Sequence, residues 1–150
     1  MFLLDTNVIS ELRKSNADHN VVRWANRVPP ASLYLSAITL LEIETGILRI
    51  ERRDKLQGAR LRTWLQQHVL PAFDGRILAV DGNVAIRCAQ LHVPDPRSEY
   101  DALIAATALV HGMPVVTRNT EDFRGSGVKV INPFISQLNE EPGEYSVTPR

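Results

Sequence analysis

The sequence lacks the features that mark secreted, membrane-spanning or metal–thiolate proteins. Cys88 is its single cysteine, which excludes an internal disulfide and any zinc or iron–sulfur site built from several thiolates. No apolar run approaches the roughly 18 residues of a membrane span. The short apolar run at residues 2–4 has no basic segment before it, which argues against a secretory signal. We therefore expect a cytoplasmic protein in a reducing compartment, with no membrane partner.

Net charge is also absent, because 17 Lys and Arg residues balance 17 Asp and Glu residues. A neutral chain is not expected to coat nucleic acid by bulk charge, although charge can still gather locally. With 150 residues, 44% of them hydrophobic, the chain suits one domain with a packed core. We expect this domain to span residues 1–134 and to be followed by a polar, flexible tail at 135–150.

Apolar runs alternate with helical patterns along the chain. We expect short strands at residues 2–4, 33–35, 76–80, 114–117 and 128–131. We expect helices at about residues 8–16, 18–27, 37–52, 54–72, 82–91 and 99–111. This alternation predicts an α/β fold, in which a mainly parallel sheet of about five strands has helices on both faces.

Acidic side chains lie where this fold places ligands, which bind beyond the carboxyl ends of parallel strands. Asp5 directly follows the first strand, and Asn119 and Asp122 follow the fourth. Glu42 lies in the second turn of the helix after the second strand, and Asp101 in the first turn of the helix before the fourth. Four acids that are distant in sequence are thus expected to converge on one edge of the sheet.

Each acid also has a purely structural interpretation. Asp5 can cap the helix that follows it, and Ser98-x-x-Asp101 has the spacing of a capping pair. A helical wheel makes Glu44 a more unusual acid than Glu42, because Glu44 shares a face with aliphatic residues. Gly46, one turn beyond Glu42, predicts a close approach of another segment.

Four ordered blocks of sequence together resemble the PIN-domain family, most nearly its VapC- and FitB-like toxins. The blocks are LLDTNVISE at 3–11, YLSAIT at 34–39 leading to Glu42 and Gly46, DALIAATA at 101–108, and VTRNTEDF at 116–123. The resemblance covers residues 1–134. It implies a three-layer PIN-like domain and a Mg²⁺- or Mn²⁺-dependent endoribonuclease that cleaves RNA with metal-activated water, without a side-chain nucleophile.

The resemblance also implies roles for individual residues. Asp5 and Asp101 match the principal metal-binding aspartates, Glu42 matches the family's acid on the helix, and Thr6 matches a hydroxyl that orients a carboxylate or water. The fourth acidic position is open, since one branch of the family points to Asn119 and the FitB-like pattern points to Asp122. Carboxylates with water in the coordination shell suit a hard cation such as Mg²⁺.

The sequence also suggests which residues contact phosphate and which surface binds a partner chain. Ten of the 17 basic residues lie between Arg13 and Arg62, which is either a phosphate-binding region or a solvated helix face. Arg118, beside the acids, is the best individual candidate for a phosphate contact. The helices at 37–72 carry surplus aliphatic residues, and the family resemblance assigns that surface to a cognate antitoxin and implies a homodimer, or a larger complex with antitoxin.

Two other function classes remain open from the residues alone. A metal-dependent DNA nuclease or phosphatase can use the same acidic cluster. A non-catalytic binding domain can use the acids only as helix caps.

Overall fold

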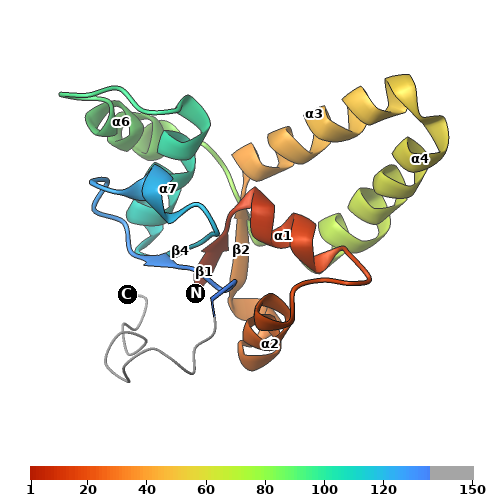
Figure 1. Cartoon of the computed structure of the whole chain (residues 1–150). Coiled ribbons are helices and arrows are strands. Elements are labelled where there is room, and N and C mark those ends of the chain that lie inside the picture. Colours follow the sequence, from red (N-terminus) through yellow and green to blue (C-terminus); the bar gives the residue numbers. More distant parts are fainter. Residues whose placement is uncertain (136–150) are drawn as a thin grey trace.

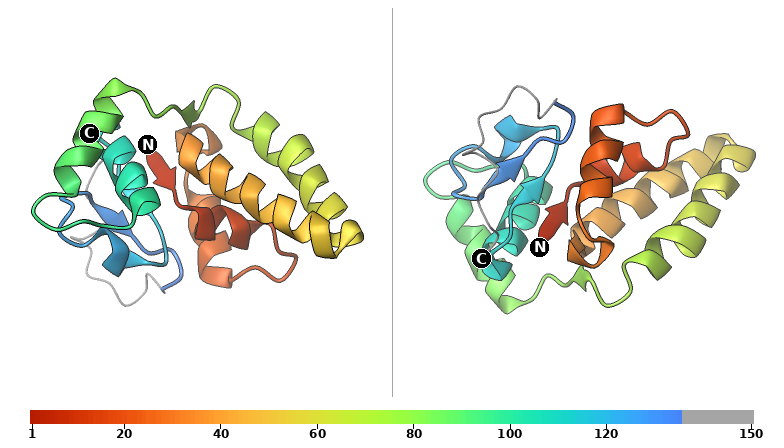
Figure 2. Two further views of the ribbon diagram at one scale, coloured as in Figure 1. Left: turned by 90° about the horizontal axis from the view of Figure 1, so that it is seen from above. Right: turned by 90° about the horizontal axis from the view of Figure 1, so that it is seen from below.

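A five-stranded sheet with helices on both faces forms the centre of the molecule (Figures 1 and 2). The structure is a computed structural model that describes residues 1–135. Residues 136–150, which hold most of the predicted tail, lie outside the described residues. Between residues 1 and 135, no helix is both long and apolar enough to cross a membrane.

The strands are β1 (Phe2–Leu4), β2 (Leu33–Ser36), β3 (Ile77–Leu78), β4 (Val115–Val116) and β5 (Val130–Ile131). Their order in the sheet is β3-β2-β1-β4-β5, and every neighbouring pair is parallel. The predicted α/β class and parallel sheet are confirmed, and β3, β4 and β5 are shorter than their apolar runs suggested. The parallel pairing brings the carboxyl ends of β1 and β4 side by side.

The main helices are α1 (Thr6–Leu12), α2 (His19–Arg27), α3 (Ala37–Arg53), α4 (Lys55–Trp64), α6 (Gly82–Leu91) and α7 (Glu99–His111). Short turns are η1 (Pro30–Ser32), η2 (Leu65–Val69), α5 (Leu70–Ala72) and η3 (Thr120–Phe123). The helix predicted at 54–72 is confirmed as a continuous helical run over α4, η2 and α5, but η2 is a π-helical turn within it, which the sequence pattern did not indicate. Helix α1 begins at Thr6, earlier than predicted, because the Asp5 carboxylate accepts the Thr6 N–H.

Two apolar layers follow from the alternation of side chains along β1. Leu3 and Leu4 are both fully buried, but they join different clusters. Leu4 packs with Trp24 of α2 and Ile43 of α3, whereas Leu3 packs with Ile104 of α7. Helices α1–α4 therefore cover one face of the sheet and α6 and α7 the other, as Figure 1 shows.

Helices α3 and α4 form a hairpin whose close approach is at Gly58. A Cβ on Gly58 would lie 2.5 Å from Cγ and 2.8 Å from Cα of Glu51, whereas nothing lies within 4 Å of a Cβ on Gly46. The predicted close approach at Gly46 is therefore wrong. Arg62 of α4 bridges the hairpin to Glu44 at 2.5 Å and to Glu51 at 2.8 Å. This ion-pair cluster accounts for Glu44, the acid that the helical wheel made unusual.

Candidate metal and nuclease site

Asp5 is the most buried acid of the candidate site, with 6% of its surface exposed. Its Oδ1 accepts the Thr6 N–H at 2.8 Å, and its Oδ2 accepts hydrogen bonds from Thr117 Oγ1 at 2.8 Å and Asn7 Nδ2 at 3.2 Å. Burial raises the pKa of Asp5, the three hydrogen bonds oppose this change, and the charge of Asp122 adds to it. Asp5 is thus a helix cap, as one interpretation predicted. It is also a carboxylate whose ionised form is disfavoured by burial and by the charge of Asp122.

Thr117 and Asn7 connect the ends of β4 and β1. The Thr117 hydroxyl, fully buried directly after β4, donates to Asp5 and accepts from Asn7 Nδ2 at 3.1 Å. It also accepts the Asn119 N–H at 3.0 Å, and Asn7 Oδ1 accepts the Arg118 N–H. We did not single out Thr117 or Asn7 from the sequence. The available signal was their place, since Thr117 is the last residue of a predicted strand and Asn7 lies three residues after the end of another.

Glu42 faces the same edge from α3. Its Oε1 accepts a hydrogen bond from Thr6 Oγ1 at 3.1 Å, so the threonine next to Asp5 orients the second acid. Burial raises the pKa of Glu42, and the charges of Asp5 and Asp101 raise it further. One turn earlier on the helix, Thr39 is fully buried, and its hydroxyl has no hydrogen-bond partner within residues 1–135.

Asp101 and Asp122 complete the group of acids. Burial raises the pKa of Asp101, and the charges of Asp122 and Asp5 raise it further, against a hydrogen bond from Ser98. Ser98 is the N-cap residue of α7 and pairs with Asp101 as predicted, but its side chain caps no backbone N–H of the helix. Asp122 lies in η3, and its charge acts on both Asp5 and Asp101. Asn119 joins the network through its backbone, since its N–H donates to Thr117 Oγ1 and its carbonyl accepts the Asp122 N–H at 3.1 Å.

The donor set fits a hard divalent cation. All four acids offer carboxylate oxygens, and three of them have raised pKa values because negative charge gathers in a partly desolvated place. Within residues 1–135, no three His, Cys, Asp or Glu side chains converge closely enough to hold an ion as they stand. Ion binding at this edge therefore requires the carboxylates to turn towards one another, which a cation would favour by removing their repulsion.

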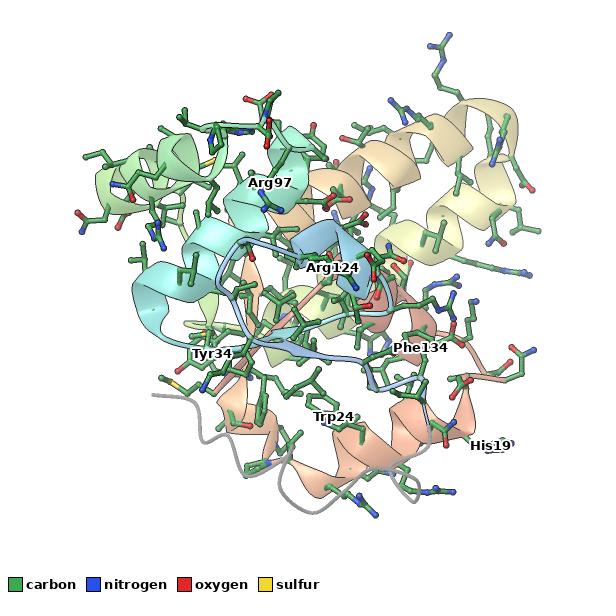
Figure 3. All side chains as sticks on the ribbon, turned by 60° about the vertical axis from the view of Figure 1, so that its left-hand side comes forward. His19, Trp24, Tyr34, Arg97, Arg124 and Phe134 are labelled. Carbon is green, nitrogen blue, oxygen red and sulfur yellow. The ribbon has the colours of Figure 1, made fainter. Side chains whose placement is uncertain are left out.

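Arginines border the site. Arg118 lies over the ring of Phe134, 3.8 Å from its centroid, and is 3.7 Å from Glu11 Oε1. Arg97, in the loop before α7, lies against the chain after η3, because its Nη2 is 2.9 Å from the position of a Cβ on Gly125. Figure 3 shows Arg97, Arg124 and Phe134 on these bordering segments. Arg118 lies in the block at 116–123 and was predicted, whereas Arg97 lies outside the four blocks and was not.

Comparisons with known proteins agree with this architecture. The family model described as the PIN domain matches residues 2–125. "VapC ribonuclease Y4jK" of Sinorhizobium fredii is 39% identical over 142 residues, covering 89% of this chain and 98% of that protein. "Toxin FitB" of Neisseria gonorrhoeae is 39% identical over 140 residues, covering 89% of this chain and 99% of that toxin.

Solved structures show the same similarity in three dimensions. FitAcB from Neisseria gonorrhoeae matches with a TM-score of 0.82 and 37% identity, covering 89% of this chain and 99% of that one. DNA-bound VapBC from Salmonella typhimurium matches with a TM-score of 0.64 and 27% identity, covering 88% of this chain and 97% of that one. The chain belongs to the PIN-domain family, within its VapC- and FitB-like toxins.

Proposed function

We propose that this chain is a Mg²⁺- or Mn²⁺-dependent endoribonuclease, the toxin of a toxin–antitoxin pair. The observation that carries the proposal is the electrostatic coupling of Asp5, Glu42, Asp101 and Asp122, which come from four separate elements to one edge of the sheet. Relatives named ribonucleases support phosphodiester hydrolysis as the reaction.

Each acid has a proposed role. Asp5 and Asp101 would hold the ion, with Glu42 and Asp122 as the further acids that position it and the attacking water. A divalent cation here would lower the pKa of water and neutralise charge on the phosphate. Thr6 holds the Glu42 carboxylate, and Thr117 and Asn7 hold that of Asp5. Asp122 is preferred to Asn119 as the fourth acid because its charge reaches both Asp5 and Asp101.

Cleavage assays with three substrates test this proposal against its rivals. Single-stranded RNA, single-stranded DNA and a phosphomonoester are each incubated with Mg²⁺ or with EDTA. We expect Mg²⁺-dependent cleavage of RNA that is lost in both Asp5→Asn and Asp101→Asn, while circular dichroism shows an unchanged fold. Cleavage of DNA or of the monoester instead would favour the alternative hydrolases. RNA cleavage retained in both variants would contradict the assigned site.

An antitoxin is the proposed inhibitor. The solved neighbours are named as FitAB and VapBC assemblies, one of them a "Toxin-antitoxin complex from Klebsiella pneumoniae". On this chain the hairpin of α3 and α4 exposes Leu41, Leu48 and Leu56, the last with 65% of its surface accessible. A second chain that covers these side chains would remove apolar surface from water.

Co-expression with the protein encoded beside this gene tests the assignment. We expect Leu48→Glu with Leu56→Glu to abolish co-purification and to leave RNA cleavage intact, whereas Ile86→Glu on α6 changes neither. Co-purification that survives the paired α3 and α4 changes would place the partner elsewhere. Light scattering of the toxin alone tests the proposed homodimer.

A further inference from the structure

A pocket of about 380 Å³ lies where the end of α1 meets α4 and η2, away from the four acids. We call it the Trp64 pocket. Its polar and aromatic lining residues are Arg13, Gln57, Arg60, Thr63, Trp64 and His68. No acid lines the pocket, so its cations are not neutralised from within. Figure 1 shows α1 lying between the sheet and α4.

Two cations of the pocket are available to a ligand. Arg13 has its Cζ 5.9 Å from the ring centroid of Trp64. Within residues 1–135, the guanidinium groups of Arg13 and Arg60 make no ion pair and no side-chain hydrogen bond. Arg62, in contrast, is fully engaged by Glu44 and Glu51. Of the ten basic residues between Arg13 and Arg62, Arg62 is thus structural, whereas Arg13 and Arg60 are unneutralised cations of the pocket.

The chemistry of the pocket matches single-stranded nucleic acid. Cations that track the backbone and an aromatic face on which a base stacks are the shared features of sites that bind single strands. Arg13 and Arg60 supply the cations, and Gln57 and Thr63 supply hydrogen-bonding groups. The half-buried indole of Trp64, over which Arg13 lies, supplies the aromatic face. An acidic peptide could use the cations, but it offers no base to the indole.

The position of the pocket connects it to the acids. Helix α1 has Thr6 at one end, beside Asp5, and Arg13 directly after the other end. Its seven residues separate the two places by roughly 10 Å along the helix axis, at 1.5 Å per residue. At Glu11, in the last turn of α1, Lys14 and Arg118 both approach the carboxylate, so two cations face one acid there.

We infer that the Trp64 pocket holds one phosphodiester and a stacked base of the single-stranded RNA whose neighbouring part lies at the four acids. This inference rests on the proposed function, because it assigns the pocket to the same substrate. The pocket contributes affinity and register, and it takes no part in bond breaking.

Fluorescence anisotropy of a labelled RNA of roughly 12 nucleotides, in EDTA so that no cleavage occurs, tests the pocket separately from catalysis. The test variant is Arg13→Gln with Arg60→Gln. The matched control is Arg52→Gln with Arg53→Gln, which removes the same charge from the exposed end of α3. We expect the test variant to raise Kd by roughly 2- to 30-fold, from two exposed charge contacts of about 0.2–1 kcal/mol each. The slope of log Kd against log salt should fall by about 1.4, with the control unchanged.

Stacking is tested on the wild-type protein, which avoids any folding defect. An abasic oligomer of equal length should bind about 5- to 150-fold more weakly, from about 1–3 kcal/mol per stacked base. A decaglutamate peptide should fail to displace the RNA. Equal weakening by both arginine pairs, equal binding of the abasic oligomer, or displacement by the peptide would each overturn the inference.

The two proposals can fail separately. RNA that does not bind in EDTA, together with intact Mg²⁺-dependent cleavage, overturns the pocket and leaves the nuclease in place. RNA that binds through Arg13 and Arg60 without any cleavage overturns the proposed function and leaves the pocket in place.

Discussion

Thr117 Oγ1 lies 2.8 Å from Asp5 Oδ2, and this hydrogen bond joins the end of β4 to the end of β1. Thr117 is fully buried and Asp5 is 6% exposed, so solvent cannot replace the bond. Of the hydrogen bonds that Asp5 accepts, the one from Thr117 does most to oppose the effect of burial on the pKa of Asp5. Thr117, the second residue of the block at 116–123, therefore influences the charge state of the acid proposed to bind the metal.

Replacement of Thr117 by Val tests this relationship. The change keeps the shape of the side chain and leaves a buried carboxylate without one of its donors, which typically costs about 1–3 kcal/mol. We expect urea unfolding to show a loss of this size and a weaker affinity for Mg²⁺ in calorimetric titration. Thr39 is the matched control, because it is also fully buried but its hydroxyl has no partner within residues 1–135. Thr39→Val should be neutral or stabilising; an equal loss in both variants would contradict the role of the Thr117 bond.

The two glycines of the α3 and α4 hairpin should respond in opposite ways to alanine. Gly46→Ala adds a methyl group in open space within α3, so stability should rise by about 0.5–1 kcal/mol from helix propensity. Gly58→Ala places its Cβ 2.8 Å from the backbone of Glu51, so overpacking of about 1–3 kcal/mol should exceed that gain. Thermal unfolding of both variants measures the sign of each change in stability. A stabilised Gly58→Ala would show that the hairpin is looser than described.

The metal-free protein should lose stability as the pH rises above about 4. Burial raises the folded-state pKa values of Asp5, Glu42 and Asp101, and the charges of neighbouring carboxylates, including Asp122, raise them further. Between their unfolded values, about 3.9–4.3, and the raised folded values, the folded state binds more protons, so its stability falls with rising pH. Urea unfolding in EDTA should show this slope, and Asp101→Asn should flatten it. Identical slopes in both proteins would contradict the coupling.

Glu11 should make the opposite contribution to the pH dependence of stability, so that its part of the stability rises with pH. Its carboxylate accepts the Asp18 N–H at 3.0 Å and lies 3.1 Å from Lys14, and these contacts lower its pKa. Its stabilisation is therefore present above the unfolded value of about 4.3 and is lost as the pH falls through the lowered folded value. We expect Glu11→Gln to cost about 1 kcal/mol at pH 7 and nothing in strong acid. A cost that persists in strong acid would show that packing, not charge, is responsible.

The sequence predicted what depends on local pattern. Short apolar runs and helical periodicity indicated the parallel sheet, and the strand ends indicated where Asp5 and Asp122 lie. The Thr117–Asn7 bridge was missed because it depends on strand order, which brings β4 beside β1 only after folding.

The close packing of α4 against α3 could not be predicted from the sequence either. Gly46 and Gly58 are both helical glycines, and only the crossing of α3 and α4 determines which one faces a neighbour. The chemistry of Glu44 likewise became clear only once Arg62 lay opposite it.

Thermal unfolding with and without Mg²⁺ tests most directly whether the four acids form a divalent-ion site. At 100 times Kd, binding adds about 2.7 kcal/mol, which for 150 residues raises Tm by about 5–10 °C at about 2–4 °C per kcal/mol. We predict this rise for the wild-type protein and none for Asp5→Asn or Asp101→Asn. No rise in the wild type, or an equal rise in the two variants, would contradict the account.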